Sequence, residues 1–224
     1  MVMEKFRNRK EAGYLLGKAL EKYKSENPIV LAIPRGGVET GYYVASHLNG
    51  ELSVIIARKL GYPEQPEAAF GAVAEDGSLY LNPWIKRRLS KEDIISVRDR
   101  EASVVERRVH LYRKGKPLPS LKNRTVILVD DGIATGATLL ACIETCRKLQ
   151  PTKIVVAVPV AGKNMKERLM TRVDDVVILS TPENFYAVSQ AYEHFESVSD
   201  EEAIRLLNMR KSMNDFKEQL SLII

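Results

Sequence analysis

Short runs of apolar residues alternate along the chain with longer stretches in which apolar residues recur every three or four positions. The short runs are rich in β-branched residues and almost free of polar ones, as expected for strands of a parallel sheet covered on both faces. They lie at residues 29–33, 52–57, 126–129, 153–160 and 176–180. Residues 38–47 and 139–149, which follow two of these runs, are predicted helices. This alternation predicts an α/β fold, a doubly wound parallel sheet flanked by helices.

Two further helices are predicted near the ends of the chain. Residues 10–23 place Leu16, Leu20 and Tyr23 at helical spacing, which indicates an amphipathic helix packed on the sheet. Residues 200–220 mix apolar residues with charges and are expected to form a closing helix.

The middle of the chain departs from the strand–helix alternation. Residues 69–74 and 78–81 look like short strands, and the Asp-Gly turn between them predicts a hairpin or a bent strand. Ser90 and Asp93 have the spacing of a capping box, which would start a charged helix running to about residue 112. This helix is an insertion on the flank of the sheet, a dimer surface or a merely solvated helix, and the pattern does not choose among these.

The chain has 224 residues, of which 45% are hydrophobic. This is enough for one well-packed α/β domain and short for two, so residues 1–224 are expected to form a single domain. No window approaches the ~18 uninterrupted apolar residues of a membrane span. Because the charged start of the chain leads into no signal-peptide core, we expect a cytoplasmic protein without a membrane partner.

The charge balance permits two kinds of partner. The 34 Lys and Arg residues outnumber the 29 Asp and Glu residues, which gives a net charge of +5. This suits a polyanionic substrate and could equally attract nucleic acid. Because the basic residues are spread through the predicted helices beside acids, and no helix-turn-helix pattern is evident, a solvated surface explains them better. Nucleic acid is therefore not an expected partner.

The cysteines and histidines indicate neither a disulfide nor a zinc site. Cys142 and Cys146 are four residues apart in a predicted helix, where the geometry does not favour a bridge between them. His47, His110 and His194 are far apart, with no ligand spacing around them. We expect the two thiols to be small buried apolar groups.

The segment after residues 126–129 carries the clearest chemical signal. Asp130 and Asp131 come directly after this run, and a loop of small and hydroxylated residues then leads into a predicted helix. Ligands of parallel sheets bind at the carboxyl ends of strands. There the loop N–H groups and the helix dipole would hold a phosphate, with Thr135 and Thr138 as hydroxyl donors, while the carboxylates would accept from sugar hydroxyls. The simpler alternative is a strand that ends in a solvated acidic turn.

A second loop follows the first predicted strand. Gly36 and Gly37 allow a close backbone approach and Arg35 brings a forked, permanently charged donor, so the loop fits pyrophosphate. An ordinary Gly-Gly turn is the alternative. Arg58 and Lys59 are expected at the end of the second strand, on the same edge of the sheet, where they would bind pyrophosphate or a carboxylate. A plain surface pair is as good an explanation of these two residues.

Residues 126–138 resemble the 5-phosphoribosyl-1-pyrophosphate (PRPP) motif of type I phosphoribosyltransferases, in the apolar strand, paired acids, Thr-Gly and final Thr. Gly132 departs from the motif, because many members carry an apolar residue there. The order of the Pro-Arg-Gly-Gly loop, a Gly- and Pro-containing stretch at 61–66, the PRPP motif and Pro-Glu-Asn-Phe at 182–185 is also similar to that family. Within it, the chain most resembles an uncharacterised bacterial and archaeal group, which leaves the acceptor unnamed.

The resemblance implies structural details and a phosphate site. The sheet would carry a small C-terminal hood, and the peptide bond between Pro34 and Arg35 would be cis. Residues 61–66 would belong to a mobile lid that excludes water from the reaction. The 5-phosphate of PRPP would be held by Ile133, Ala134, Thr135, Gly136, Ala137 and Thr138.

The resemblance also implies a reaction. A nitrogenous acceptor, with a purine-like base favoured, would attack the anomeric carbon of PRPP, and pyrophosphate would leave. Asp130 and Asp131 would be the catalytic residues at the ribose, and Mg²⁺ would lie near them and, by a looser match, near Glu193. Phe185 or Tyr186 would stack on the acceptor, although packing in the core is the alternative for both. A homodimer is expected because dimers are common in the family.

Two other functions stay open at this point. The first is a regulator that binds PRPP or a nucleotide without turning it over, since this fold also serves as a sensor. Against it stands the lack of an attached DNA-binding module. The second is an enzyme that resembles PRPP synthetase, which would need an ATP site that the sequence does not show.

Overall fold

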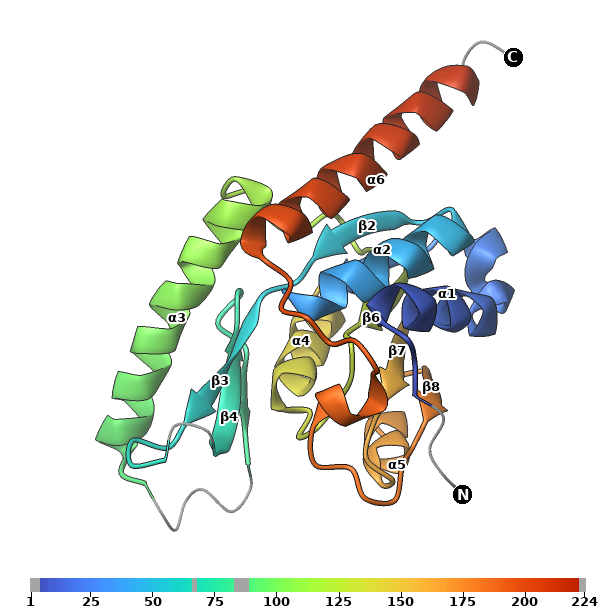
Figure 1. The fold of residues 1–224 in the computed structure, drawn as a ribbon. Coiled ribbons are helices and arrows are strands. Elements are labelled where there is room, and N and C mark those ends of the chain that lie inside the picture. The colour runs from blue at the N-terminus through green and yellow to red at the C-terminus, as the bar shows by residue number, and fades with distance from the viewer. Residues whose placement is uncertain (1–4, 66–67, 83–88, 222–224) are drawn as a thin grey trace.

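The structure is a computed structural model that describes residues 5–65, 68–82 and 89–221. Its main sheet has five parallel strands in the order β2 (Glu51–Val54), β1 (Ile29–Ala32), β6 (Thr125–Val129), β7 (Lys153–Val160) and β8 (Asp175–Ser180) (Figure 1). The chain winds from β1 outward to β2 and, in the other direction, from β6 to β8. The strand order therefore reverses between β1 and β6, and such a reversal opens a crevice at the carboxyl ends of the two strands. The predicted α/β fold is confirmed.

Helices cover both faces of this sheet (Figure 1). On one face lie α1 (Arg9–Ala19) and α2 (Gly36–Leu48), and on the other lie α4 (Ala137–Lys148) and α5 (Met165–Met170). Because neighbouring strand residues point to opposite faces, Val30 packs in the cluster of the first pair and Leu31 in that of the second. Both are fully buried, which explains why the strands are continuous apolar runs.

The predicted helix at residues 10–23 is two elements in the structure. α1 begins after Asn8, whose side chain accepts a hydrogen bond from the Glu11 N–H (3.0 Å). It ends at Ala19, and the 3₁₀ helix Glu21–Glu26 follows. The prediction also lacked α5, because its six residues are too few to show a helical period.

A second, antiparallel sheet stands beside the main one and consists of β3 (Ala57–Gly61), β4 (Ala69–Ala74) and β5 (Leu79–Leu81). The β4–β5 hairpin is confirmed. α3 (Lys91–Arg113) begins at the predicted capping box, in which the Asp93 N–H donates to Ser90 Oγ (3.0 Å). This helix packs on β3 and β4 and so covers the flank of the second sheet (Figure 1).

The predicted end of the strand at residues 52–57 is wrong. β2 ends at Val54, and the chain changes sheets before β3 begins. Ile55 and Ile56 are both buried but belong to different apolar clusters, so the apolar run continues through the change of sheet. Arg58 and Lys59 consequently lie inside β3 and not at the carboxyl end of a main-sheet strand.

The last part of the chain closes the molecule over the carboxyl edge of the main sheet. Val188, Ala191 and Tyr192 pack against Phe6 and Ala12 from the start of the chain, which forms the expected C-terminal hood. α6 (Asp200–Ser221) then packs on α2 and β2 and extends away from the body (Figure 1). Among the residues that the structure describes, no helix is both long and apolar enough to cross a membrane.

Candidate active site at the carboxyl edge of the sheet

The two loops that follow β1 and β6 meet at the point where the strand order reverses. A Cβ atom on Gly36 would lie 1.9 Å from Asp131 Oδ2, and one on Gly37 would lie 3.0 Å from Asp130 Oδ1. The two glycines are therefore needed because the backbone of the first loop lies directly against the acidic pair. The Pro34–Arg35 peptide bond is cis, as expected from the resemblance. The structure thus brings together two motifs that are almost a hundred residues apart in the sequence.

The two carboxylates are poorly solvated and differ in their partners. Asp130 Oδ1 accepts a hydrogen bond from the Asp131 N–H (2.8 Å), and burial together with the charge of Asp131 raises the Asp130 pKa well above its ordinary value. Burial also raises the pKa of Asp131, but Arg9 opposes this because its Nε lies 2.7 Å from Asp131 Oδ2. Arg9 therefore compensates directly for the burial of the Asp131 carboxylate.

The loop between the acids and α4 has the geometry of an anion cradle. Gly136 adopts a left-handed conformation (φ +77°) and caps α4, and its carbonyl accepts the first helical bond from the Leu140 N–H (2.9 Å). The N–H groups of the first helical turn have no acceptor within the helix. Ala134 and Thr135 are exposed and Thr138 is half-buried, so a phosphate could reach this end of the helix.

Two residues of this loop serve the packing of the protein. The Ile133 N–H donates to the Val160 carbonyl (2.9 Å), and its side chain is buried, so the prediction that Ile133 contacts the phosphate is not supported by its surroundings. A Cβ atom on Gly132 would lie 2.6 Å from Val188 and 2.8 Å from Val160. Many members of the resembling family carry an apolar side chain at this position. Here the hood fills the space that such a side chain would need, which explains the glycine.

Two arginines of the predicted pyrophosphate site, Arg35 and Arg58, interact electrostatically with a third arginine. Arg35 is exposed, and Arg58 donates from Nε to Glu101 Oε2 of α3 (3.1 Å). Arg108, a half-buried residue of α3 that the sequence analysis missed, lies close enough that burial and the charges of Arg58 and Arg35 lower its pKa. An anion bound here would relieve this repulsion. Lys59, on the same strand as Arg58, is exposed.

Arg9 is the functional candidate that the sequence analysis missed most clearly. Its side chain is buried and reaches Asp131 from the start of α1. The helix dipole disfavours a cation in the first turn of a helix, so an arginine at this position was a signal that could have been noticed. Tyr192 of the hood joins the same group, because its hydroxyl donates to the Asp131 carbonyl (2.6 Å).

The hood aromatics are placed differently from one another. Phe185 is half-buried in the hood cluster, whereas the Tyr186 side chain is 81% exposed. Glu193 is exposed, and its N–H donates to the Phe6 carbonyl (2.8 Å). Within the described ranges, no group of three His, Cys, Asp or Glu side chains could hold a metal ion, so Glu193 does not complete a carboxylate set with the Asp pair.

The predicted lid lies in the connection between β3 and β4. This connection closes with a hydrogen bond from the Tyr62 N–H to the Ala68 carbonyl (3.0 Å). Position 66, the last residue of the predicted lid, falls outside the described residues. Arg168 of α5 links the neighbouring β5 to the phosphate loop, because it donates to Tyr80 Oη (2.5 Å) and to the Thr135 carbonyl (3.1 Å). The hairpin and the phosphate loop are therefore linked through Arg168.

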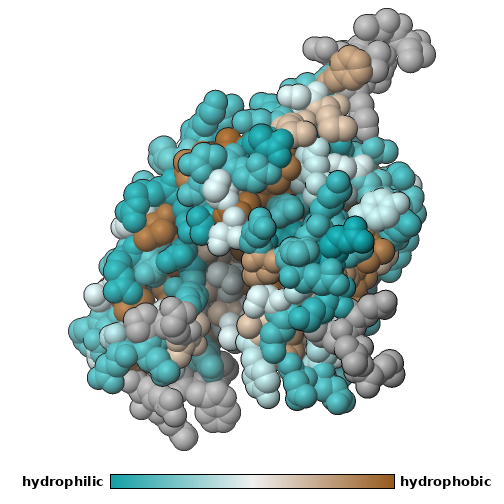
Figure 2. Space-filling model, viewed as in Figure 1, coloured by the Kyte–Doolittle hydropathy of each residue, from teal (hydrophilic) through white to brown (hydrophobic). Residues whose placement is uncertain are grey.

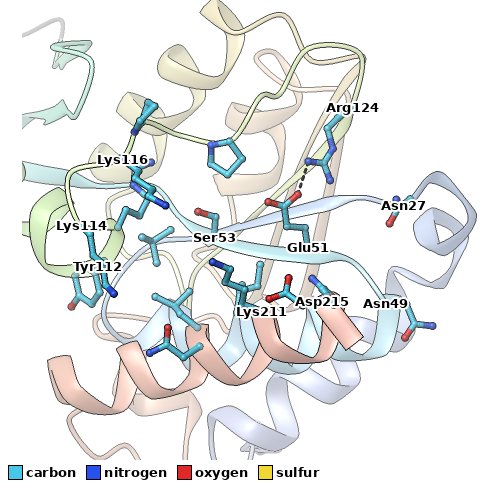
Figure 3. A pocket seen from close by; sticks show the side chains of 18 residues that line it. Asn27, Asn49, Glu51, Ser53, Tyr112, Lys114, Lys116, Arg124, Lys211 and Asp215 are labelled. Atoms are coloured by element: carbon cyan, nitrogen blue, oxygen red, sulfur yellow. Dashed lines mark hydrogen bonds and ion pairs between the residues drawn. The ribbon is translucent and has the colours of Figure 1, made fainter. Parts of the chain in front are cut away.

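A groove of about 800 Å³ lies elsewhere, along the outer edge of β2 between α6 and the segment after α3 (Figure 3). Lys114, Lys116 and Lys211 line it, together with an ion pair between Arg124 and Glu51 (2.6 Å). No predicted site residue lies in its lining. We therefore place the candidate site at the carboxyl edge, where the buried charges and the predicted motifs converge.

The fold and this edge define an α/β protein with a candidate phosphate site at the reversal of its strand order. Residues 7–196 match the model of the phosphoribosyl transferase domain family, and the chain belongs to that family. Two proteins from strains of Mycobacterium tuberculosis, both named "Putative phosphoribosyl transferase", are 38% identical to it over 218 residues, or 96% of this chain and 49% of theirs. The chain therefore spans about half the length of these curated relatives.

Among solved structures, the protein TT1426 from Thermus thermophilus is similar to this chain along almost its whole length. The two share 42% sequence identity, with a TM-score of 0.77. The match covers 91% of this chain and 98% of TT1426. The two chains therefore share the arrangement of their elements.

Proposed function

We propose that this chain is an Mg²⁺-dependent phosphoribosyltransferase that transfers the 5-phosphoribosyl group of PRPP to a nitrogenous acceptor and releases pyrophosphate. The observation that carries the proposal is the contact of the Gly36–Gly37 backbone with Asp130 and Asp131. It supports the proposal because the predicted pyrophosphate loop lies directly against the two carboxylates that precede the predicted phosphate loop. This is the set of groups that a phosphorylated and pyrophosphorylated ribose requires.

Different residues then bind different parts of the substrate. The 5-phosphate lies against residues 134–138 at the start of α4, and the ribose hydroxyls donate to or accept from the acidic pair. Pyrophosphate lies at Arg35 and the glycine backbone, and Arg58 and Arg108 add positive charge. Because the leaving group carries most of the charge that develops in the reaction, catalysis here consists of positioning and charge stabilisation.

The acidic pair also fits a bound Mg²⁺. Carboxylate oxygens suit this ion, which keeps several waters and borrows substrate oxygens, so two aspartates without a third carboxylate are sufficient. Asp130 and Asp131 would hold it through the ribose hydroxyls or water. When bound, Mg²⁺ neutralises negative charge on the pyrophosphate.

The acceptor is a nucleobase, with a purine-like base favoured, and the hood is where it binds. Tyr186 supports this placement because its exposed ring is available for stacking, whereas Phe185 is held in the hood core. A cytoplasmic location stays a prediction.

A homodimer is part of the proposal. Met209, Met213 and Phe216 are exposed at positions that share one face of α6. Apolar colour is visible along this helix where it leaves an otherwise mostly hydrophilic surface (Figure 2). An exposed apolar stripe of this kind is suited to cover the same stripe of a second copy. Light scattering of Phe216→Ser should show a shift toward monomer.

Pyrophosphate release tests the proposal. The purified chain would be incubated with PRPP, Mg²⁺ and, one at a time, purine bases, pyrimidine bases and small amines. Release that depends on one acceptor would support the transferase and identify its substrate. Tight PRPP binding without release for any acceptor would instead favour the regulator, and the absence of both would contradict the proposal.

A further inference from the structure

Arg9 is buried more deeply than an arginine with a purely structural role on a helix needs to be. It is the first residue of α1 and is only 6% exposed, although the helix dipole disfavours a cation there. Burying a guanidinium is costly unless it is paired and hydrogen-bonded. Its contacts therefore show what its burial serves.

The Arg9 guanidinium makes three separate contacts. Nε donates to Asp131 Oδ2 (2.7 Å), and Nη1 donates to the Glu196 carbonyl (2.6 Å). The plane of the group lies over the Phe195 ring, 3.8 Å from its centroid. One arginine thus joins the acidic pair to two residues that follow the hood.

Asp131 is fixed from other directions as well. A Cβ atom on Gly36 would meet both Asp131 Oδ2 (1.9 Å) and Arg9 Nε (2.9 Å), so the ion pair lies directly against the pyrophosphate loop. The Tyr192 hydroxyl donates to the Asp131 carbonyl (2.6 Å). The Asp131 carboxylate therefore has little freedom while Arg9 is in place.

We propose that Arg9 is a positioning residue of the PRPP site, which holds Asp131 against the Gly36 backbone and ties the hood to it. The inference rests on the proposed function, because it assumes that Asp131 binds the ribose. Arg9 itself contacts no substrate and acts through Asp131. Lysine cannot replace it, since an ammonium group lacks the planar fork that reaches Asp131 and Glu196 together while stacking on Phe195.

The chain offers a matched control in Arg210. This residue of α6 is also buried, at 1% exposed, and donates from Nε (3.0 Å) and Nη2 (2.8 Å) to the Gly50 carbonyl. Gly50 precedes β2, at the amino end of the sheet and away from the acidic pair. Arg210→Lys should therefore perturb the fold as Arg9→Lys does without touching the site.

The test compares steady-state constants and melting temperatures of Arg9→Lys, Arg210→Lys and wild type. For Arg9→Lys we expect the KM for PRPP to rise at least about tenfold, with a smaller fall in kcat, because the ribose site loses its alignment. Arg210→Lys should lower the melting temperature and leave both constants unchanged. Wild-type constants in Arg9→Lys, or equal changes in both variants, would overturn the inference.

A second variant keeps the inference testable if Arg9→Lys does not fold. Phe195→Leu removes only the ring under the guanidinium and should raise the KM for PRPP about two- to fivefold; an unchanged KM would count against the inference. If the wild type binds PRPP without turnover, dissociation constants from calorimetry replace KM in the same comparison. If it neither binds nor consumes PRPP, the proposed function fails and takes the inference with it, whereas an active wild type with insensitive Arg9 variants defeats the inference alone.

Discussion

The carboxyl edge of the main sheet and the groove beside β2 are both lined with charged side chains, but these charges are held in different ways. At the carboxyl edge, Asp131 is 14% exposed and is fixed by the buried Arg9. In the groove, the Arg124–Glu51 pair is 28% and 40% exposed, and the neighbouring lysines are exposed as well. Surface pairs of the second kind contribute little to stability, whereas a buried charge persists only with its partners.

The difference shows how the site of this protein is recognised. The groove offers volume, yet none of the predicted site residues lines it. The carboxyl edge offers glycines whose missing side chains make room for carboxylates, and residues from four distant segments converge there. Convergence and burial, rather than volume, identify the reactive region.

Of the changes considered for the two regions, removing the acidic pair should have the largest effect on turnover. In the double variant Asp130→Asn/Asp131→Asn, we expect turnover of PRPP to fall by at least about 10³-fold, because the ribose loses both carboxyl groups of the acidic pair. The melting temperature should also fall, since Arg9 is left buried without its partner. Pyrophosphate release measured below the melting transition checks the result.

The matched control for this variant changes the charges of the groove. Lys116→Gln/Lys211→Gln alters two side chains that line the groove and none at the carboxyl edge. Its turnover should equal that of the wild type. A larger loss in the lysine variant than in the aspartate variant would reverse the assignment of the two regions.

A methyl group at Gly36 should have the next largest effect. The added Cβ would overlap Asp131 Oδ2, and that carboxylate cannot move freely because Arg9 holds it. A displacement on the order of 1 Å at a reacting group can cost about 10²-fold, so we expect kcat/KM of Gly36→Ala to fall by about that factor. Gly162→Ala is the control, because its Cβ would meet nothing within 4 Å. Equal activity in the two variants would show that the close approach has no function.

Gly132→Ala should affect stability more than chemistry. The new methyl group would press on Val160 and Val188 beneath the hood, and overpacking of this kind costs about 1–3 kcal/mol. Chemical denaturation would measure the loss in free energy of unfolding. If the contact with Val188 causes it, the double variant Gly132→Ala/Val188→Ala should recover part of the loss. A double variant less stable than the sum of the two single changes would contradict this explanation.

The smallest change is expected in the groove. Glu51→Gln breaks the Arg124–Glu51 ion pair, which is partly exposed, so it should cost less than about 1 kcal/mol and leave turnover unchanged. High salt should shrink even this difference, because salt screens exposed charges. A large loss of activity in this variant would mean that the groove belongs to the site after all.

The sequence predicted the parts of the molecule in which local pattern and tertiary structure agree. The strands of the main sheet are continuous apolar runs because both faces are covered, so their positions were visible. The end of β2 was not visible, since Ile55 and Ile56 stay buried while the chain changes sheets. The motifs around Asp131 were visible one by one, but their contact with Gly36 arises only from the strand order.

Arg9 and Arg108 were missed for a related reason. Each lies among other charged residues in the sequence, as a solvated side chain does, and only Arg9 gave a local signal, by its place at the start of a helix. Asp131, which forms the ion pair with Arg9, is distant from it in the chain. Arg35 and Arg58, whose charges act on Arg108, are distant from Arg108 in the same way. Interactions of this kind depend on tertiary structure, which hydrophobic periodicity does not report.

A crystal structure of the wild-type chain with PRPP and Mg²⁺ would test the central claim most directly. We expect the 5-phosphate against residues 134–138 at the start of α4, the ribose at Asp130 and Asp131, and pyrophosphate beside Arg35 and Gly36. Well-ordered PRPP in the groove along β2, with the carboxyl edge empty, would contradict the account.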